Sequence, residues 1–453
     1  MILNSFLISV IEFRKDLIIV LNIVETFSGV GAQSEALKRA KIPFKVSATV
    51  EWELSAIYAY DILHNGPQDL SLYRHHNKES LLKELAQYNL SSNGKEPMTE
   101  KALSALTVGQ LKAIYHSLIN NNNLVDITSV SADDLDDDID ILTYSFPCQD
   151  LSVSARWWNN SSGLDRDSGN RSSLLWEIER LLIEFKEQNK PFPKFLLMEN
   201  VTAIRSKAHI ENFRVWTNFL EDLGYVNQIY DLSATNFGVP QSRKRTYMIS
   251  VFVGDDLEIE QEVMDYFLSN NLEHIQLSAE NINPISDYLR LDYSVKHYLE
   301  EAIHATPNFT ASREKIFNNN LKLATDSQAD NSLIARTITT KQDRNPNSGI
   351  IAYDKNPLVE GTRYRNLTPR EAFLLMGFTE ENFDNLTIKN PSEDVKKAFL
   401  TQAKLLKLAG NSIVVNVLCG IFKQMDYINT HILPQDDKES QSLSDFGLEI
   451  NIL

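Results

Sequence analysis

The sequence IDILTYSFPCQDLS, residues 139–152, governs the interpretation of the whole chain. Its apolar first half predicts a buried strand, and Pro147 and Cys148 open the polar turn that follows. Open α/β sheets bind ligands at the carboxyl ends of their strands, so we expect the thiol at such an edge. Proline fixes its own φ and restricts the residue before it, which stiffens the turn. Because a free cysteine is more often a small buried residue than a reactive one, this stretch alone leaves both interpretations open.

Length and composition set the class of protein. The 453 residues are 43% hydrophobic and 23% charged, which is typical of a folded protein of about two domains and excludes a disordered chain or a fibre. The two cysteines, Cys148 and Cys419, lie far apart and predict no disulfide framework, hence a cytoplasmic protein. No uncharged stretch predicts a membrane-spanning helix. The formal charge of −17 means that any nucleic-acid binding needs a local basic patch.

A strand, a glycine turn and a helix form the first unit of the chain. Residues 18–26 are a β-branched run, Gly29 and Gly31 follow, and residues 35–40 predict a helix. This order is typical of the opening unit of a Rossmann-like domain. Two glycines alone are weak evidence, because the third glycine of the dinucleotide-binding pattern is missing.

Acidic residues follow the next two predicted strands. The strand at 44–50 ends at Glu51, where a carboxylate can accept hydrogen bonds from both hydroxyls of a ribose. A solvated surface acid explains Glu51 equally well. Residues 56–123 have a helical pattern without an assignable chemistry. Asp126 then follows a short apolar run, and its carboxylate could accept from an adenine amino group.

Two further strands bring a carboxylate and two arginines to the same sheet. Residues 195–198 predict a strand that ends at Glu199. The sequence QSRKR leads into another strand at 246–253, and in an extended segment Arg243 and Arg245 point to one side. Paired guanidiniums beside a cleft can bind a phosphate or a carbonyl oxygen, although isolated arginines are more often surface charges.

Beyond residue 255 the alternation of strands and helices is lost, and a second, smaller domain is expected. The segment is rich in Asn, Ser and Thr, and its later part is the most basic region of the chain. The sequence then predicts a capped helix, with Thr368 as N-cap, Pro369 at the first turn and Glu371 completing a capping box. A last apolar helix is expected at 414–425.

Six motifs occur in a fixed order between residues 24 and 422: FSGVGA, PCQDLS, ENV, QSRKR, RNLTPREAFLLMGF and AGNSIVVNV. In this respect the sequence resembles the DNA cytosine-5 methyltransferases of bacterial restriction-modification systems. The resemblance implies an α/β, Rossmann-like S-adenosylmethionine-dependent methyltransferase domain with a smaller, irregular target-recognition domain. The implied segments are an N-terminal extension, the catalytic and cofactor-binding domain, the target-recognition domain, the return to the catalytic domain and an acidic tail, at 1–16, 17–254, 255–360, 361–430 and 431–453.

The resemblance also implies a catalytic mechanism. Cys148 would add to carbon 6 of cytosine, so that carbon 5 could attack the methyl group of S-adenosylmethionine. Glu199 would hold the N3 and amino edge of the ring. Arg243 and Arg245 would contact the base carbonyl and the cysteine loop or a phosphate. The target base would be flipped out of double-stranded DNA, because a stacked base cannot reach the thiol.

The same resemblance implies the binding residues, and no metal ion. Those for the cofactor would be Phe27, Ser28, Gly29, Gly31, Glu51, Trp52, Asp126, Pro147, Asn411 and Ser412. Those for DNA would be Gln149, Ser152 and Thr337, and the basic segment of the chain adds Arg336, Lys341 and Arg344 as candidates.

Other functions remain possible from the sequence. A tRNA cytosine-5 methyltransferase shares these motifs but usually has a shorter recognition region than the 119 residues between QSRKR and RNLTPRE. A catalytically silent DNA-binding regulator should have lost Cys148 or Glu199, and both are present. An NAD-dependent oxidoreductase would leave the later motifs without a role. We expect a monomeric cytoplasmic enzyme, without a membrane partner, that protects host DNA from a cognate endonuclease.

Overall fold

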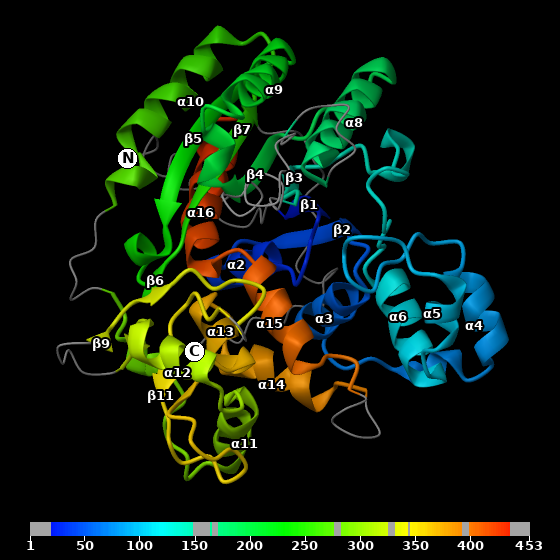
Figure 1. Ribbon diagram of the computed structural model, residues 1–453. Coiled ribbons are helices and arrows are strands. Elements are labelled where there is room, and N and C mark those ends of the chain that lie inside the picture. The colour runs from blue at the N-terminus through cyan, green and yellow to red at the C-terminus, as the bar shows by residue number, and fades with distance from the viewer. Residues whose placement is uncertain are drawn as a thin grey trace, which may run out of the picture.

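The computed structural model describes residues 20–147, 164, 171–275, 282–324, 331–342, 345–391 and 398–434. Six strands form its central sheet: β1 Leu21–Thr26, β2 Phe44–Val50, β3 Ile141–Tyr144, β4 Phe195–Val201, β5 Tyr225–Ser233 and β7 Lys244–Phe252. Their order across the sheet is β2-β1-β3-β4-β7-β5 (Figure 1). Strands β1 to β4 pair in parallel, whereas β7 is antiparallel to both of its neighbours. This is a Rossmann-like α/β sheet, as predicted.

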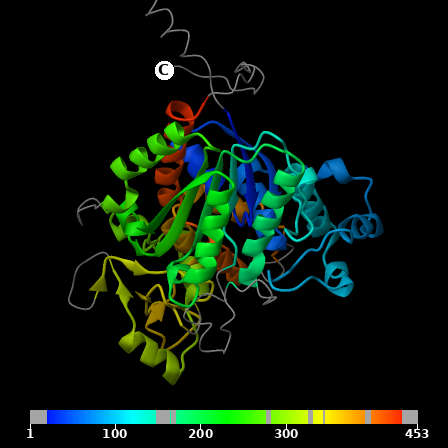
Figure 2. The same cartoon turned by 90° about the horizontal axis from the view of Figure 1, so that it is seen from above.

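Helices cover both faces of this sheet and bury two apolar clusters. One face is covered by α8 (Leu175–Glu187) and α9 (Ile210–Asp222). The other is covered by α2 (Ala32–Ala40), α10 (Leu257–Ser269) and α16 (Val415–His431) (Figure 2). Successive residues of a strand point to opposite faces, so strands buried on both sides read as continuous apolar runs.

The predicted elements differ from the observed ones mainly at their ends. The strand at 44–50 is confirmed, and the run from residue 139 contains the shorter β3. The strand predicted to end at residue 198 continues to Val201, so Glu199 lies within it rather than after it. The extension follows from the antiparallel partner β7, which pairs with β4 as far as Arg245.

The helical segment after β2 is an insertion beside the first strands. It contains α3 Leu54–Asn65, α4 Lys78–Leu85, α5 Glu100–Ser104 and α6 Val108–Asn120. Its base is held by the fully buried carboxylate of Asp61, which accepts hydrogen bonds from Asn65, Gln68, Ser117, Asn120 and Asn121. This network fastens α6 to α3, which fixes where the insertion meets the sheet.

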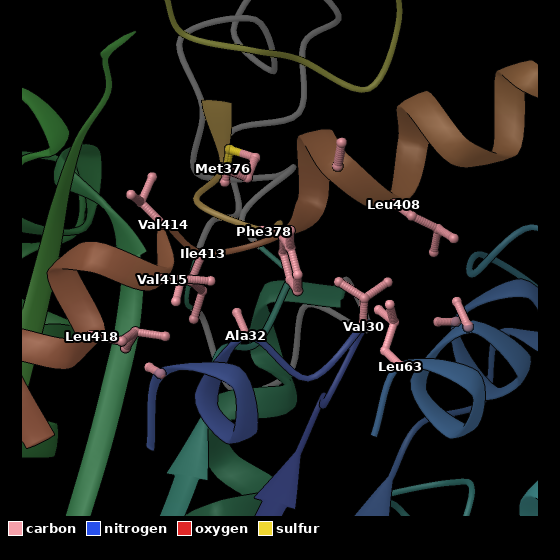
Figure 3. Close-up of a cluster of buried hydrophobic side chains, with 14 of the residues drawn as sticks. Val30, Ala32, Leu63, Met376, Phe378, Leu408, Ile413, Val414, Val415 and Leu418 are labelled. Carbon is pink, nitrogen blue, oxygen red and sulfur yellow. The ribbon is translucent and has the colours of Figure 1, made fainter. Parts of the chain in front are cut away.

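An apolar cluster joins the glycine turn after β1 to the last motif of the chain. Val30 and Ala32 meet Ile413, Val414 and Val415 in this cluster, and Figure 3 labels all five side chains. Because these residues are buried, the start of α2 and the segment before α16 are held at one place on the sheet edge.

A smaller region lies beside the sheet domain and is built from short elements (Figures 1 and 2). These are α11 Lys296–Ala305, α12 Ala311–Asn319, β8 Lys322–Leu323, β9 Asn331–Ser332, β10 Ala335–Arg336, β11 Ile351–Ala352 and β12 Tyr364–Arg365. The predicted domain boundary at 255 stays a prediction, although α10 packs on the sheet through Val263 and Phe267.

The predicted capped helix after this smaller region is confirmed. In α13 (Pro369–Leu375), Thr368 and Glu371 make the predicted capping box. Glu371 also forms a two-pronged ion pair with Arg365, with both distances 2.8 Å and both side chains fully buried. Such a pair is costly to break from one side, so it fixes how β12 joins α13.

The described part of the chain ends in the apolar helices α15 (Gln402–Asn411) and α16, after the short α14 (Glu380–Ile388). By length and composition alone, the described stretch Gln402–His431 could cross a membrane, which the sequence analysis did not predict. Most of it is buried inside the protein and it is divided into two helices at Ser412. It is therefore explained as core, and Cys419 is half-buried there, its thiol donating to the carbonyl of Ala36.

Candidate active site

Glu199 and Arg245 form an ion pair at the edge where β4 ends and the antiparallel β7 begins. The distance from Arg245 Nε to Glu199 Oε1 is 3.3 Å, and both side chains are more than four-fifths buried. Burial raises the pKa of the Glu199 carboxyl, while the charges of Arg245 and then Arg243 oppose that rise. A carboxyl group balanced in this way can accept a hydrogen bond when charged and can supply a proton when neutral.

Polar contacts anchor the backbone that leads to Cys148, at Phe146 and at Pro147. The buried amide of Asn200 donates to the carbonyl of Phe146 at 3.1 Å, and the hydroxyl of Ser172 donates to the carbonyl of Pro147 at 2.9 Å. Cys148 itself lies outside the described residues, as do the predicted DNA contacts Gln149, Ser152 and Arg344. The two anchors nevertheless bring the start of the cysteine turn beside the strand of Glu199.

Arg243 is buried and its recorded hydrogen bonds go to backbone carbonyls. It donates to Ile338 at 3.0 Å, to Ser412 at 2.8 Å and to Gly410 at 3.3 Å. The sequence analysis expected contacts with the base or the cysteine turn, and these stay predictions. The observed bonds give Arg243 a second role, because they join Ile338, in the predicted recognition region, to the last motif.

The predicted DNA-contacting residues that the structure describes lie next to this arginine. Strand β10 pairs in parallel with the two-residue strand β6 (Gln241–Ser242), so Arg336 lies opposite Ser242. The hydroxyl of Thr337 donates to the carbonyl of Ser242 at 2.7 Å. Arg336 and Lys341 are exposed, as residues that contact a phosphate must be.

The glycine turn after β1 has a backbone that few residues can adopt. Phe27, Gly29 and Gly31 have φ values of 53°, 57° and 73°. A Cβ atom on Gly31 would lie 2.2 Å from Nε2 of His64, so no side chain fits there. A turn with free space on one side and a helix start on the other can hold a ligand against its backbone, which fits an adenosyl cofactor.

Glu51 is held against this turn by backbone N–H groups rather than by a cation. Its Oε2 atom accepts from the Gly29 N–H at 3.0 Å and its Oε1 from the Glu53 N–H at 2.8 Å. Burial raises the pKa of the Glu51 carboxyl to about 7. The sequence prediction thus gains geometric support, because the acid and the glycine turn are in direct contact.

The other predicted cofactor residues differ in their exposure and in their contacts. Trp52 packs against the larger apolar cluster, and the N–H of the buried Ser28 donates to the carbonyl of Val50. Asn411 is exposed at the end of α15, and Ser412 caps that helix. Asp126 accepts from the Asn89 amide at 2.5 Å and from Thr128.

Sequence reasoning missed the asparagine that holds the two acidic segments together. The side-chain oxygen of Asn123 accepts from the N–H of Glu51 at 3.2 Å and of Val125 at 2.8 Å. Val125 has a φ of 65°, which is strained for a β-branched residue. Asn200 was missed in the same way. Asn123 lies three residues before Asp126 and Asn200 directly follows Glu199, so their closeness to a predicted acid could have identified both.

A cavity of about 450 Å³ opens between the insertion and the sheet domain. Its lining includes Tyr88, Leu118, Asn122, Leu124 and Ser129. None of the predicted cofactor residues lines this cavity, so the cavity is not the candidate cofactor site. We place the candidate site by the side-chain geometry. Gly29 and Glu51 follow the carboxyl ends of β1 and β2, and Glu199 lies near the carboxyl end of β4, at the same edge of the sheet.

Comparisons with known proteins agree with this geometry. The model of the family "C-5 cytosine-specific DNA methylase" matches residues 88–426. The chain is 30% identical to the orphan methyltransferase M.SssI of Spiroplasma monobiae, over 89% of this chain and 97% of that protein. It is 32% identical to the type II methyltransferase M2.ScrFI of Lactococcus lactis subsp. cremoris, over 89% and 99%.

Solved structures show the same fold. The structure of the S. pombe Dnmt2 methyltransferase matches with a TM-score of 0.55 and 18% identity, over 90% of this chain and 98% of that one. The family match covers well over half of the chain and the relatives cover nearly all of it. The chain therefore belongs to the C-5 cytosine-specific DNA methylase family, and is an enzyme that methylates carbon 5 of cytosine in DNA with S-adenosylmethionine as methyl donor.

Proposed function

We propose that the enzyme methylates a cytosine that is flipped out of a short, specific double-stranded sequence, through a covalent adduct with Cys148. The observation that carries the proposal is the buried pair of Glu199 and Arg245 beside the anchored start of the cysteine turn. A base inside a duplex cannot reach such a recessed group, so the base has to leave the stack.

The roles of the side chains follow from the chemistry of the ring. The thiolate of Cys148 adds to carbon 6, and Glu199, whose pKa is raised by burial, donates to N3 as electron density moves into the ring. Carbon 5 is then nucleophilic and takes the methyl group, which the cofactor supplies when bound. Loss of the proton from carbon 5 to solvent water, return of the N3 proton to Glu199 and release of the thiolate from carbon 6 restore the double bond.

Arg245 keeps the Glu199 carboxyl from becoming too basic, since its charge lowers the pKa that burial raises. In the cofactor site, Glu51 would accept from the ribose hydroxyls, and the N–H groups of the turn at Gly29 and Gly31 would face the cofactor. Asp126 would accept from the adenine amino group, and Phe27, Trp52 and Pro147 would enclose the rest. Asn411 and Ser412 would close the methionine end.

The target-recognition domain is proposed to lie within residues 255–360, with its sequence-reading part after the sheet-packed helix α10. Exposed Arg336 and Lys341 would contact phosphates, and Thr337 would contact the phosphate beside the flipped nucleotide. With a net charge of −17, binding must depend on this local basic surface and weaken steeply with salt.

Both named relatives are bacterial methyltransferases, one called type II and one called orphan. We propose that the enzyme is a cytoplasmic monomer that protects DNA from a cognate endonuclease, and a genome without such a nuclease would indicate the orphan role instead. The burial of Gln402–His431 within the fold supports the absence of a membrane partner.

The test is to incubate the purified protein with S-adenosylmethionine and unmethylated genomic DNA, and to sequence the DNA by a method that resolves 5-methylcytosine. We expect methylation at one short motif by the wild type and none by the Cys148→Ser variant. Methylation of tRNA without methylation of DNA would overturn the proposed substrate. Cofactor binding without any methylation would support the silent-regulator alternative.

A further inference from the structure

The helical insertion between Glu51 and Asp126 has no role in the proposed function, yet it touches the cofactor residues directly. The N–H of Ser91 donates to the carbonyl of Trp52 at 2.7 Å, and the N–H of Leu54 donates back to the carbonyl of Ser91 at 2.9 Å. These two bonds form a parallel bridge between Ser91 and Glu53. The insertion is thus fixed to the segment that immediately follows Glu51.

A second contact ties the same part of the insertion to the last motif. The ammonium group of Lys407, on α15, donates to Oε2 of Glu53 and to the backbone carbonyl of Asn93, both at 2.6 Å. Lys407 precedes the predicted cofactor residue Asn411 by one helical turn. Residues 91–93 are therefore held between two segments that are expected to border the cofactor.

The third contact reaches the predicted adenine-binding acid itself. The amide Nδ2 of Asn89 lies 2.5 Å from Oδ2 of Asp126. The other oxygen, Oδ1, accepts from the N–H of Thr128 at 3.0 Å and from its hydroxyl at 2.9 Å. The carboxylate is therefore held in one orientation from both sides, and Oδ2 keeps a second lone pair for another donor.

We propose that the insertion completes the adenine end of the cofactor site and that Asn89 is a positioning residue, which orients the Asp126 carboxylate toward the 6-amino group of adenine. This inference rests on the proposed role of Asp126 in cofactor binding. A charged carboxylate only accepts hydrogen bonds, so it favours an amino group and repels the carbonyl oxygen of a 6-oxopurine. Holding the carboxylate in place therefore sharpens the discrimination between adenine and hypoxanthine.

The alternative is that Asn89 only stabilises the insertion. Loosening the insertion would weaken both kinds of ligand alike, whereas misplacing the carboxylate would weaken the adenine ligand alone. Asn89 is exposed, so its replacement leaves the apolar core intact. Asn77 offers a matched control, because its side chain caps α4 of the same insertion by accepting from the N–H of Ser80.

The experiment measures, by calorimetry on the full chain, the dissociation constants of S-adenosyl-L-homocysteine and S-inosyl-L-homocysteine. The variants are Asn89→Ala, Asn89→Gln, Asn77→Ala and Asp126→Ala. We expect Asn89→Ala to reduce the preference for the adenine ligand by about 3- to 10-fold, since one hydrogen bond to a charged group is disturbed. Asn89→Gln, which keeps the amide donor, should restore part of that preference, and Asn77→Ala should leave it at the wild-type value.

Two outcomes overturn the inference while leaving the proposed cofactor site intact. One is an unchanged preference in Asn89→Ala combined with a lost preference in Asp126→Ala. The other is an equal weakening of both ligands by Asn89→Ala and Asn77→Ala, which would mean a structural role only. An unchanged preference in Asp126→Ala would instead refute the proposed adenine contact, and the inference with it.

Discussion

Two buried carboxylates lie at the edge of one sheet and are stabilised in different ways. Glu199, on β4, faces the cation of Arg245 at 3.3 Å, with Arg243 nearby. Glu51, after β2, faces no described cation in ion-pair distance and instead accepts from the N–H groups of Gly29 and Glu53. Burial raises the pKa of both carboxyls.

The difference matches the two tasks that we propose. A carboxyl that meets a ring nitrogen has to exchange a proton, and an adjacent arginine limits how tightly that proton is held. A carboxylate that binds a neutral diol needs acceptor oxygens in fixed directions, which backbone N–H groups provide without a mobile counter-charge. The same residue type thus serves catalysis at one strand end and binding at another.

The largest expected effect comes from removing the acidic group at Glu199. We expect Glu199→Gln to lower kcat by about 1,000-fold, because the amide cannot donate a proton to N3, a loss of about 4 kcal/mol of transition-state stabilisation. Methyl transfer from labelled S-adenosylmethionine to DNA under single-turnover conditions measures it. Affinity for the cofactor should stay at the wild-type value, and a parallel loss of cofactor binding would contradict the separation of the two sites.

Next in size is the effect of removing the charge at Glu51. We expect Glu51→Gln to weaken S-adenosylmethionine binding by about 100-fold, since two hydrogen bonds to a charged acceptor are replaced by weaker ones. Calorimetry measures the dissociation constant. Single-turnover methylation at saturating cofactor should be nearly normal, in contrast to Glu199→Gln.

The same carboxyl predicts a pH dependence. Its pKa is raised to about 7, so below that pH the free enzyme holds a proton that has to leave before the ribose is bound. Affinity for the cofactor should therefore fall by up to about 10-fold for each pH unit below 7. Glu51→Gln should bind with a flat profile from pH 5.5 to 8. A pH dependence that persists in this variant would assign the titration to another group.

A third buried acid, Glu25, sharpens the comparison of Glu199 with Glu51, because it has no arginine partner among the described residues and no proposed contact with the cofactor. Glu25 is fully buried, accepts from the Ser34 hydroxyl at 2.5 Å, and burial raises its pKa from 4.5 to about 7. The folded protein binds this proton more tightly than the unfolded chain does. The stabilisation linked to the proton is therefore complete below the unfolded pKa of 4.5 and is lost as pH rises through 7. We expect Glu25→Gln to be more stable than wild type at pH 8 by about 3 kcal/mol and to show no such gain near pH 4.5. Urea unfolding at both pH values measures it, and equal differences at both would refute the assigned pKa.

The smallest effect is expected at Asn200. Replacing it by Ala removes the hydrogen bond to the carbonyl of Phe146, which costs about 1 kcal/mol. Because this bond anchors the cysteine turn, kcat should fall about 5-fold while cofactor binding is unchanged. Asn227→Ala is a control, because it removes a partly buried side-chain amide on β5 that donates to the carbonyl of Thr217. A matching loss in that variant would show a general effect on folding.

Periodicity predicted most of the fold because both faces of the sheet are buried. The strand 44–50 and the capping box at Thr368 and Glu371 were found from local patterns alone. The end of β4 was missed because it depends on the antiparallel partner β7, which is distant in sequence. Strand length here is set by pairing and not by the apolar run.

The residues assigned to the site from the sequence stay predictions, and their contacts could not be predicted at all. Motif order pointed to Glu51 and Gly29, and the structure brings them together. The bonds from Arg243 to three backbone carbonyls and the contact of Asn89 with Asp126 join segments with no shared local pattern. Such contacts depend on how the insertion and the predicted recognition region pack against the sheet. No short stretch of the sequence contains the information that determines this packing.

The central claim is that Cys148 attacks the cytosine ring and that Glu199 assists this attack. It is tested most directly with a duplex that carries 5-fluorocytosine at the target position, because fluorine cannot leave carbon 5 as a proton does. With S-adenosylmethionine present, the wild type should form a covalent complex that survives denaturing electrophoresis. Glu199→Gln should form it far more slowly, and Cys148→Ser not at all. A wild-type enzyme that methylates the normal duplex but is never trapped by the fluorinated one would contradict the account.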